Sequence, residues 1–252
     1  MPNLGLHVGF ALDCGRRLGH PVVDDHQGSF LLGCTTPDIR LFMGWERERT
    51  HFFKLATDPC GAGFEGLMRT NPHLRRSESL SRETVAFILG YVSHLYTDET
   101  WIVQVWRRYF GRDSALAGDP AVQLLDRAFQ FELDRQERQR IQGLEEALES
   151  IKGAYAGVEV GFIDGPTLRR WQETVLDRVG RDLPWERFRG FVRRVHRVQD
   201  DAEIDAILGK VPQMLEKVRA HVQESEVQAF RENAIRAFVV RATEYLAEGE
   251  VE

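Results

Sequence analysis

The sequence predicts an all-α protein, and three observations lead to this prediction. Through most of the 252 residues, apolar side chains recur every three or four positions, which is the spacing of amphipathic helices. No stretch has the alternating pattern of a β-strand, and no internal repeat is visible. Helix-start signals such as Asp119 with Pro120 and Gly165 with Pro166 separate the periodic segments. We therefore expect a bundle of many helices.

The N-terminal third is expected to contain one long helix followed by shorter segments. Asn3 is a suitable N-cap for a helix over residues 4–18. Residues 21–29 are polar and predict a connection, whereas residues 30–42 are mostly apolar but are interrupted by Pro37. Because proline disfavours a helical conformation in the residue before it, the chain should bend at this point.

A central helix is predicted over residues 82–110, after a long loop. Residues 57–79 are rich in glycine, proline, asparagine and charge, which indicates the loop. Ser81 can cap the helix that follows. From Val85 to Thr97 the sequence contains no Lys, Arg, Asp or Glu, so this helix should be buried.

The C-terminal half is expected to be helical almost throughout. Its dense mixed charge is typical of the solvated faces of amphipathic helices. The predicted helical segments are residues 121–141, 143–155, 166–183, 185–198, 202–222 and 226–247. We expect residues 119–252 to pack on residues 1–118 in the same domain, since the chain is long enough to bury a sizeable core.

The composition limits the classes of function. The chain has 33 basic and 39 acidic residues and a formal charge of -6, which argues against a general nucleic-acid-binding protein. No stretch approaches the roughly 18 apolar residues of a transmembrane helix, and the first residues lack the features of a signal peptide. Three cysteines without CxxC spacing fit reduced thiols better than a disulfide framework. Together these observations predict a cytoplasmic protein.

Two polar residues of the central helix need a partner. His94 and Asp98 are one turn apart on the same side of this helix. Burying an imidazole and a carboxylate without partners costs roughly 2 kcal/mol or more for each group. A bound cation would satisfy both side chains, and so would an ordinary hydrogen bond between them.

Three further polar residues interrupt apolar sequence in the N-terminal half. His7 lies on the apolar side of the first helix, Asp38 follows a proline, and His51 stands where a charged stretch returns to apolar residues. Taken singly, each has an ordinary explanation as a core histidine, a helix cap or a loop-edge histidine. Together with His94 and Asp98 they indicate a metal site, because imidazole nitrogens and carboxylate oxygens suit zinc and are also accepted by iron and manganese.

The stretches that carry these five residues occur in a recognisable order. They are the N-terminal helix with His7, FLLGCTTPDI with Asp38, THF with His51, and FILGYVSHLYTDETW with His94 and Asp98. In this order and spacing, residues 1–105 resemble the zinc-dependent phospholipase C family. The resemblance implies an all-helical bundle of the phospholipase C and P1 nuclease type, here with additional C-terminal helices. It also implies a cluster of up to three zinc ions and hydrolysis of phosphodiesters.

The same resemblance implies a division of the ligands. Asp38, His51, His94 and Asp98 would hold one zinc ion, and His7 would contribute to a second ion that Asp98 bridges. The family's N-terminal amine ligand and its later histidine and glutamate ligands have no evident match in this sequence. The substitutes considered are Asp24, Asp25, His26, Glu99 and His196. We therefore expect one or two ions.

The resulting hypothesis is a metal-dependent hydrolase of phosphoester bonds that acts on a small phosphoester or a lipid head group. Water activated by the metal would be the nucleophile, with Asp38 as a ligand or as the base for that water. Arg40, Arg47 or Arg49 could contact phosphate, although three ordinary surface arginines are the simpler interpretation. Two alternatives are a non-catalytic helical scaffold or binding protein with a structural zinc, and a nuclease on single-stranded nucleic acid. The chain has no His-Asp dipeptide, which speaks against an HD-type phosphohydrolase.

Overall fold

The structure is a computed structural model that describes residues 3–196 and 199–248, and these residues form helices and turns but no β-strand. The predicted all-α class is confirmed. The helices are α1 (Leu4–Leu18), α2 (Pro21–Asp25), α3 (Gln27–Thr35), η1 (Thr36–Asp38), α4 (Ile39–Met43), α5 (Glu48–His51), α6 (Ala62–Thr70), η2 (Pro72–Leu74), η3 (Ser77–Ser79), α7 (Arg82–Thr100), η4 (Trp101–Phe110), α8 (Val122–Arg140), α9 (Leu144–Ile151), α10 (Gly165–Val179), η5 (Trp185–Phe188), α11 (Arg189–His196), α12 (Asp201–Leu208), α13 (Val211–Arg219) and α14 (Glu224–Ala247).

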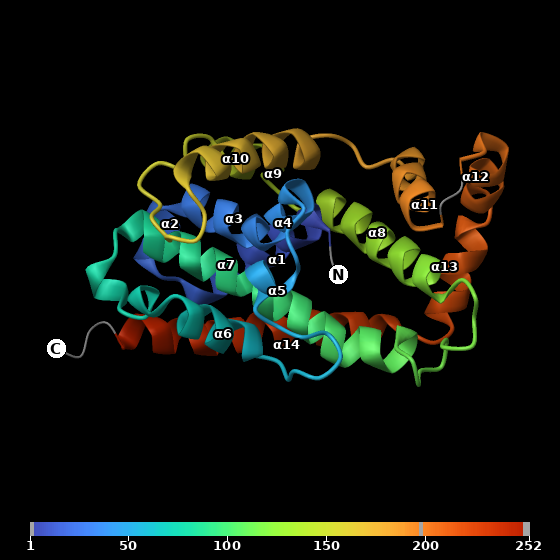
Figure 1. Cartoon of the computed structure of the whole chain (residues 1–252), viewed down its shortest axis with the longest axis horizontal. Coiled ribbons are helices and arrows are strands. Elements are labelled where there is room, and N and C mark those ends of the chain that lie inside the picture. The colour runs from blue at the N-terminus through green and yellow to red at the C-terminus, as the bar shows by residue number, and fades with distance from the viewer. Residues whose placement is uncertain (1–2, 197–198, 249–252) are drawn as a thin grey trace.

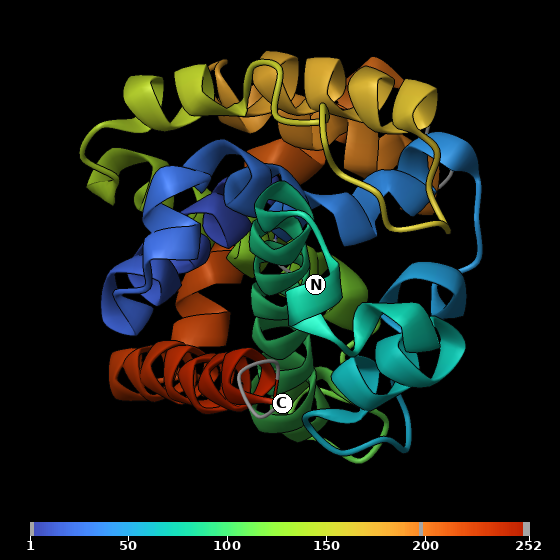
Figure 2. The same ribbon diagram turned by 90° about the vertical axis from the view of Figure 1, so that its left-hand side faces the viewer.

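Helix α7 runs through the middle of the molecule and contacts α1, α2, α3, α6 and α14. In Figure 1, α14 lies along one edge and α9 and α10 along the opposite edge, with α1, α3 and α7 between them. Figure 2 shows the same arrangement from the end of the bundle. Nearly every residue of α7 after Glu83 is buried, as the absence of charge in this stretch predicts. Among the described residues, no helix combines the length and the apolar character needed to cross a bilayer.

Helices α3 and α7 touch through their backbones. A Cβ atom at Gly33 would lie 2.0 Å from the carbonyl oxygen of Phe87, and one at Gly90 would lie 1.8 Å from the carbonyl oxygen of Phe30. Only glycine fits at these two positions, because neither carbonyl oxygen can move unless its whole helix moves. This contact sets the separation of the two helices and places the C-terminal end of α3 beside His94.

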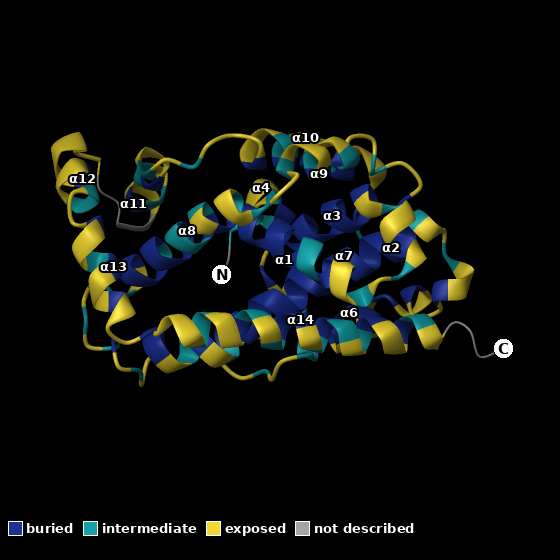
Figure 3. Ribbon diagram, turned by 180° about the vertical axis from the view of Figure 1, so that it is seen from behind, coloured by how far each residue is buried: buried dark blue, intermediate teal, exposed yellow. Residues whose placement is uncertain are grey.

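The main hydrophobic core contains side chains from both halves of the chain. It includes Phe10 on α1, Phe30 on α3, Trp101 at the start of η4 and Phe230 and Phe238 on α14. A smaller cluster lies between α8, η5, α11 and α12 and consists of Leu124, Ala128, Phe131, Phe188, Val192 and Ile204. Figure 3 shows the buried residues concentrated on α1, α3 and α7 and the exposed ones on the outer helices.

Several helix boundaries agree with the sequence signals. The Ser81 hydroxyl accepts a hydrogen bond from the Thr84 N–H at 3.1 Å, so the predicted N-cap of α7 is confirmed. Gly19 ends α1 in the left-handed conformation. The central helix continues to Phe110, but its last ten residues have the wider π-helical geometry of η4, a form that often occurs near functional sites.

Three predicted segments are wrong. Residues 21–29 contain α2 and the start of α3 instead of a polar connection, and residues 57–79 contain the nine-residue helix α6. Phe64 and Leu67 of α6 are buried in the core, and this burial stabilises a helix that glycine-rich composition alone does not favour. The helix predicted over 202–222 divides into α12 and α13 near Gly209.

The first turn of α1 is held by another helix. Asn3 stands at the N-cap position, but its side chain makes no capping hydrogen bond. The backbone N–H of Leu6 instead donates to Oδ1 of Asp134 on α8. Asp134 also pairs with Arg138, whose Nε lies 2.9 Å from Oδ2. Helix α8 therefore fixes the start of the helix that carries His7.

Candidate metal centre

The five polar residues that interrupt the apolar sequence lie together at the centre of the fold. His7 comes from α1, Asp38 from the end of η1, His51 from the last position of α5, and His94 and Asp98 from α7. None of the five is more than 6% exposed. Their donor atoms form two overlapping groups, and within each group these atoms lie no more than 4.8 Å apart. The groups are His7, His94 and Asp98, and Asp38, His51 and His94.

Several polar atoms of this cluster have no hydrogen-bond partner in the described structure. They are both ring nitrogens of His7 and one carboxylate oxygen each of Asp38 and Asp98. Unpartnered polar atoms are rare in buried positions because each costs free energy comparable to a lost hydrogen bond. A cation among these atoms removes that cost, so the residues present fit a bound metal ion.

The separations between the donor atoms match the dimensions of a zinc site. The Nε2 atom of His51 lies 3.3 Å from Nε2 of His94 and 3.2 Å from Oδ2 of Asp98. The His94 Nε2 atom is 3.8 Å from Asp98 Oδ2, and His51 Nε2 is 3.9 Å from Asp38 Oδ1. In a tetrahedral site with zinc–nitrogen bonds of about 2.0–2.1 Å, neighbouring ligand atoms stand about 3.3 Å apart. Two of the four separations have this value, and the other two exceed it by about half an ångström.

A backbone carbonyl and a threonine hydroxyl fix the orientation of two imidazole rings. Nδ1 of His94 lies 2.7 Å from the carbonyl oxygen of Cys34. Because a carbonyl only accepts, Nδ1 carries the proton and Nε2 presents its lone pair to the cluster. Nδ1 of His51 lies 3.0 Å from the Thr50 hydroxyl, which donates to the carbonyl of Pro37 at 2.8 Å. Partners of this kind set the tautomer of metal-binding histidines.

The electrostatics favour the protonation states that bind metal. Burial lowers the pKa of His51, and burial together with the nearby His7 lowers the pKa of His94 well below its usual value. Burial acts to raise the pKa of Asp98, but His51, His7 and His94 hold it well below the usual range. The two imidazoles are therefore neutral and the carboxylate is ionised near neutral pH, as metal ligands must be.

The three arginines near Asp38 have different environments. Nη2 of Arg47 donates to Asp98 Oδ2 at 2.9 Å, and Nη1 donates to the carbonyl of Phe53 at 3.2 Å. The guanidinium of Arg49 stacks on the Trp45 ring at 3.7 Å. Nε of Arg40 is buried without an acceptor among the described residues. Arg47 is thus part of the cluster, an arrangement that its charged sequence neighbourhood does not predict.

Glu99 joins α7 to the start of α6 beside the cluster. Its carboxylate accepts hydrogen bonds from the backbone N–H groups of Gly61 and Gly63 at the start of α6. A Cβ at Gly63 would lie 2.8 Å from the carbonyl of His51 and closer still to Glu99. Gly63 therefore allows α6 to approach α5 and α7.

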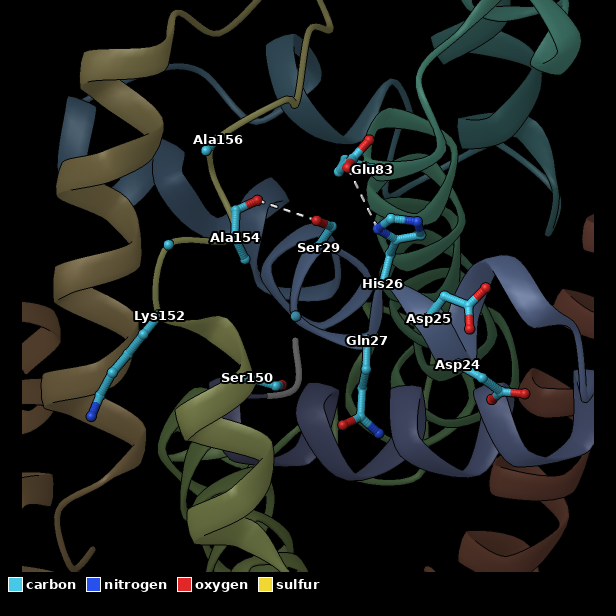
Figure 4. Close-up of a pocket in the computed structure, with 12 residues that line it drawn as sticks. Asp24, Asp25, His26, Gln27, Ser29, Glu83, Ser150, Lys152, Ala154 and Ala156 are labelled. Atoms are coloured by element: carbon cyan, nitrogen blue, oxygen red, sulfur yellow. Dashed lines mark hydrogen bonds and ion pairs between the residues drawn. The ribbon is translucent and has the colours of Figure 1, made fainter.

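The other candidate ligands lie elsewhere. Asp24, Asp25 and His26 line an open surface cavity of about 420 Å³ that contains none of the five cluster residues. Figure 4 shows that His26 pairs there with Glu83, at 3.7 Å between Nδ1 and Oε1. The side chain of His196 lies outside the described residues. Within the described part of the chain, the cluster therefore receives no ligand from Asp24, Asp25 or His26.

Comparison with known families gives one match. Residues 7–101 match the model of the family described as zinc dependent phospholipase C. The match begins at His7 and includes the other four cluster residues. It spans less than half of the chain, so the helices from α8 onward lie outside it. No curated protein and no solved structure matches this chain.

Proposed function

We propose that this protein is a zinc-dependent hydrolase of phosphodiester bonds with phospholipase C-like chemistry. The observation that carries the proposal is the convergence of five buried imidazole and carboxylate side chains from four separate elements. The ligand separations suit a tetrahedral ion, and the family match over residues 7–101 supports the reaction class. Iron and manganese would accept the same ligands.

Each residue has a part in this proposal. His51, His94, Asp38 and Asp98 would hold one ion, and His7 stands beside Asp98 at 3.5 Å. When bound, the metal supplies a water of lowered pKa and positive charge for a phosphate oxygen. Asp38 is the most exposed of the five, and one of its oxygens lacks a partner. Asp38 would therefore act as a ligand or, when displaced from the metal, as the base for the attacking water.

The activity can be tested with bis(p-nitrophenyl) phosphate as a generic phosphodiester. We expect hydrolysis that is lost after chelation and restored by zinc. Asp38→Asn should lower the rate about a hundredfold or more, because proton transfer by a positioned group contributes about 10²–10⁴-fold. Asp24→Asn, on the exposed surface of α2, is the matched control and should leave the rate unchanged.

A second candidate function is a helical scaffold with a structural zinc ion. The deep burial of His7, His51, His94 and Asp98 favours it, because structural zinc sites are closed whereas catalytic sites keep one position open. The same purified protein distinguishes the two. Bound zinc without hydrolysis of the diester, a phospholipid or single-stranded DNA would support the scaffold and refute the hydrolase.

Within the hydrolase proposal, the surface beside Asp38 favours a lipid substrate. Leu41 and Phe42 follow Asp38 on α4 and are 63% and 47% exposed. Exposed large apolar side chains close in sequence to a site residue suit a substrate presented in a bilayer, because inserting them removes apolar area from water. Arg40 on α4 and Arg49 on α5 could pair with the lipid phosphates.

This substrate preference gives a separate prediction. The double change Leu41→Ser and Phe42→Ser should lower hydrolysis of phospholipid in vesicles about tenfold, since losing about 1.4 kcal/mol of insertion energy has that effect. Hydrolysis of the soluble diester should not change. Val240→Ser is the control, because Val240 is 54% exposed but lies on α14, away from α4 (Figures 1 and 2). An equal fall with both substrates would exclude interfacial binding through α4.

A further inference from the structure

Arg47 places a permanent positive charge inside the candidate metal centre. Arg47 stands one helical turn before His51 and is only 8% exposed. The guanidinium is fixed between the Asp98 carboxylate and the Phe53 carbonyl, with its central carbon 5.8 Å from the Phe53 ring. A guanidinium stays protonated under all ordinary conditions. Any ion bound by Asp98 must therefore bind next to this charge.

The two groups of donor atoms cannot both hold an ion fully. They share His94, and its Nδ1 donates to the Cys34 carbonyl, so only Nε2 can bind metal. An ion held by this nitrogen together with His51, Asp38 and the Oδ2 atom of Asp98 would leave the second group with only His7 and the Oδ1 atom of Asp98. Two protein ligands are fewer than the three or four of typical zinc sites.

The two oxygens of the Asp98 carboxylate face different neighbours. Its Oδ2 atom faces Arg47 at 2.9 Å and His51 at 3.2 Å, whereas Oδ1 faces His7 at 3.5 Å. A second ion bridged by Asp98 would bind at Oδ1, on the same carboxylate that already pairs with Arg47. The guanidinium withdraws part of the negative charge that would attract this ion.

The charge balance of the site also disfavours a second ion. Asp38, Asp98 and Arg47 together carry one net negative charge, so one divalent ion bound among these three groups leaves a single positive charge to attract a phosphodiester anion. The neighbouring Glu99 carboxylate is not counted with them, because it is hydrogen-bonded to the backbone N–H groups of Gly61 and Gly63 at the start of α6. A second divalent ion would leave three positive charges in a buried site, which is costly to hold away from water. Arg47 thus makes a second ion unfavourable.

We propose that Arg47 takes the place of a second metal ion, so that the site binds one zinc ion tightly and has a guanidinium as its second cation. The inference extends the proposed function, since the net charge left by one ion suits a phosphodiester. It concerns the number of metal ions and can be tested without any assay of activity.

The test is metal stoichiometry and affinity in the whole chain, by elemental analysis after dialysis and by calorimetric titration with zinc. We expect one tightly bound ion per wild-type chain. In Arg47→Met, which keeps much of the volume but removes the charge, a second ion should bind about tenfold tighter or more than in the wild type. Arg47→Lys keeps the charge and should still bind one ion.

A double variant identifies where the second ion binds. Arg47→Met combined with His7→Ala should return to one ion, because His7 is the remaining protein ligand beside Asp98 Oδ1. Cobalt titration of the wild-type protein is independent of every variant and should give a tetrahedral spectrum that saturates at one equivalent. Circular dichroism would confirm that each variant is folded.

The outcomes separate this inference from the proposed function. Two or more tightly bound ions in the wild type, or the same stoichiometry and affinity in Arg47→Met as in the wild type, would overturn the role of Arg47 and leave the hydrolase intact. A wild-type protein that binds no metal would overturn both. One bound ion without phosphodiesterase activity would refute the hydrolase alone.

Discussion

Replacing His94 by alanine is expected to remove zinc from the protein and, with it, any hydrolysis. His94 belongs to both groups of donor atoms, and no other described residue does. Zinc sites of four protein ligands bind with about 10–16 kcal/mol, so losing one ligand costs on the order of 3 kcal/mol, or more than a hundredfold in affinity. The rings of His94 and His7 also stack with centroids 3.6 Å apart, so the change loosens His7 as well.

The measurement is the zinc content of the purified variant after dialysis, together with the affinity from titration. His221→Ala is the matched control, because His221 is exposed and lies outside the cluster. Its zinc content should equal that of the wild type. A folded His94→Ala protein with an unchanged zinc content would show that the cluster is not a metal site.

The candidate site was predictable from the sequence because its residues contradict their surroundings. His7, His94 and Asp98 are polar side chains on the apolar sides of helices, and such a conflict between local pattern and burial is typical of functional positions. The order of the surrounding motifs added the resemblance to a known family. The structure places all five predicted residues within one buried cluster. Their role as metal ligands is the proposal that the experiments described above would test.

The partners of these residues could not be predicted from the sequence. Arg47 and Arg49 are both in the charged stretch ERERT, yet one is buried against Asp98 and the other stacks on Trp45. The difference depends on a carboxylate 51 positions away in the chain. The carbonyl of Cys34 is a backbone atom, which residue types do not reveal. The sequence contains a weak indication that Thr50 is a partner of His51, since Thr50 directly precedes His51 in THF.

The errors in the fold have a similar origin. The helix α6 was predicted as loop because glycine, proline and asparagine surround it. Its helical state depends on burying Phe64 and Leu67 in the core and on the Glu99 carboxylate at its first N–H groups. Both interactions are tertiary, and tertiary packing overrides a composition that is weakly unfavourable for a helix. The prediction of the central helix was correct because its apolar spacing and its N-cap are local features of the sequence.

Gly90→Ala is expected to be among the most destabilising single substitutions in this chain. Alanine normally favours a helix by about 1 kcal/mol over glycine, but at this position its Cβ would lie 1.8 Å from the Phe30 carbonyl oxygen and 2.9 Å from the Cys34 nitrogen. Both are backbone atoms of α3, so the two helices must separate. Overpacking of this kind costs about 1–3 kcal/mol or more, which exceeds the gain in helix propensity.

The separation of α3 from α7 in Gly90→Ala should also weaken zinc binding, because the Cys34 carbonyl that orients His94 moves with α3. Thermal and urea unfolding of the metal-free and zinc-loaded proteins would measure both effects. Gly190→Ala is the matched control: Gly190 lies on the exposed surface of α11, and a Cβ there meets nothing within 4 Å. This control should be neutral or stabilise the protein by up to about 1 kcal/mol. Equal stabilities of the two variants would mean that α3 and α7 are not in backbone contact, and the position of His94 would then need another explanation.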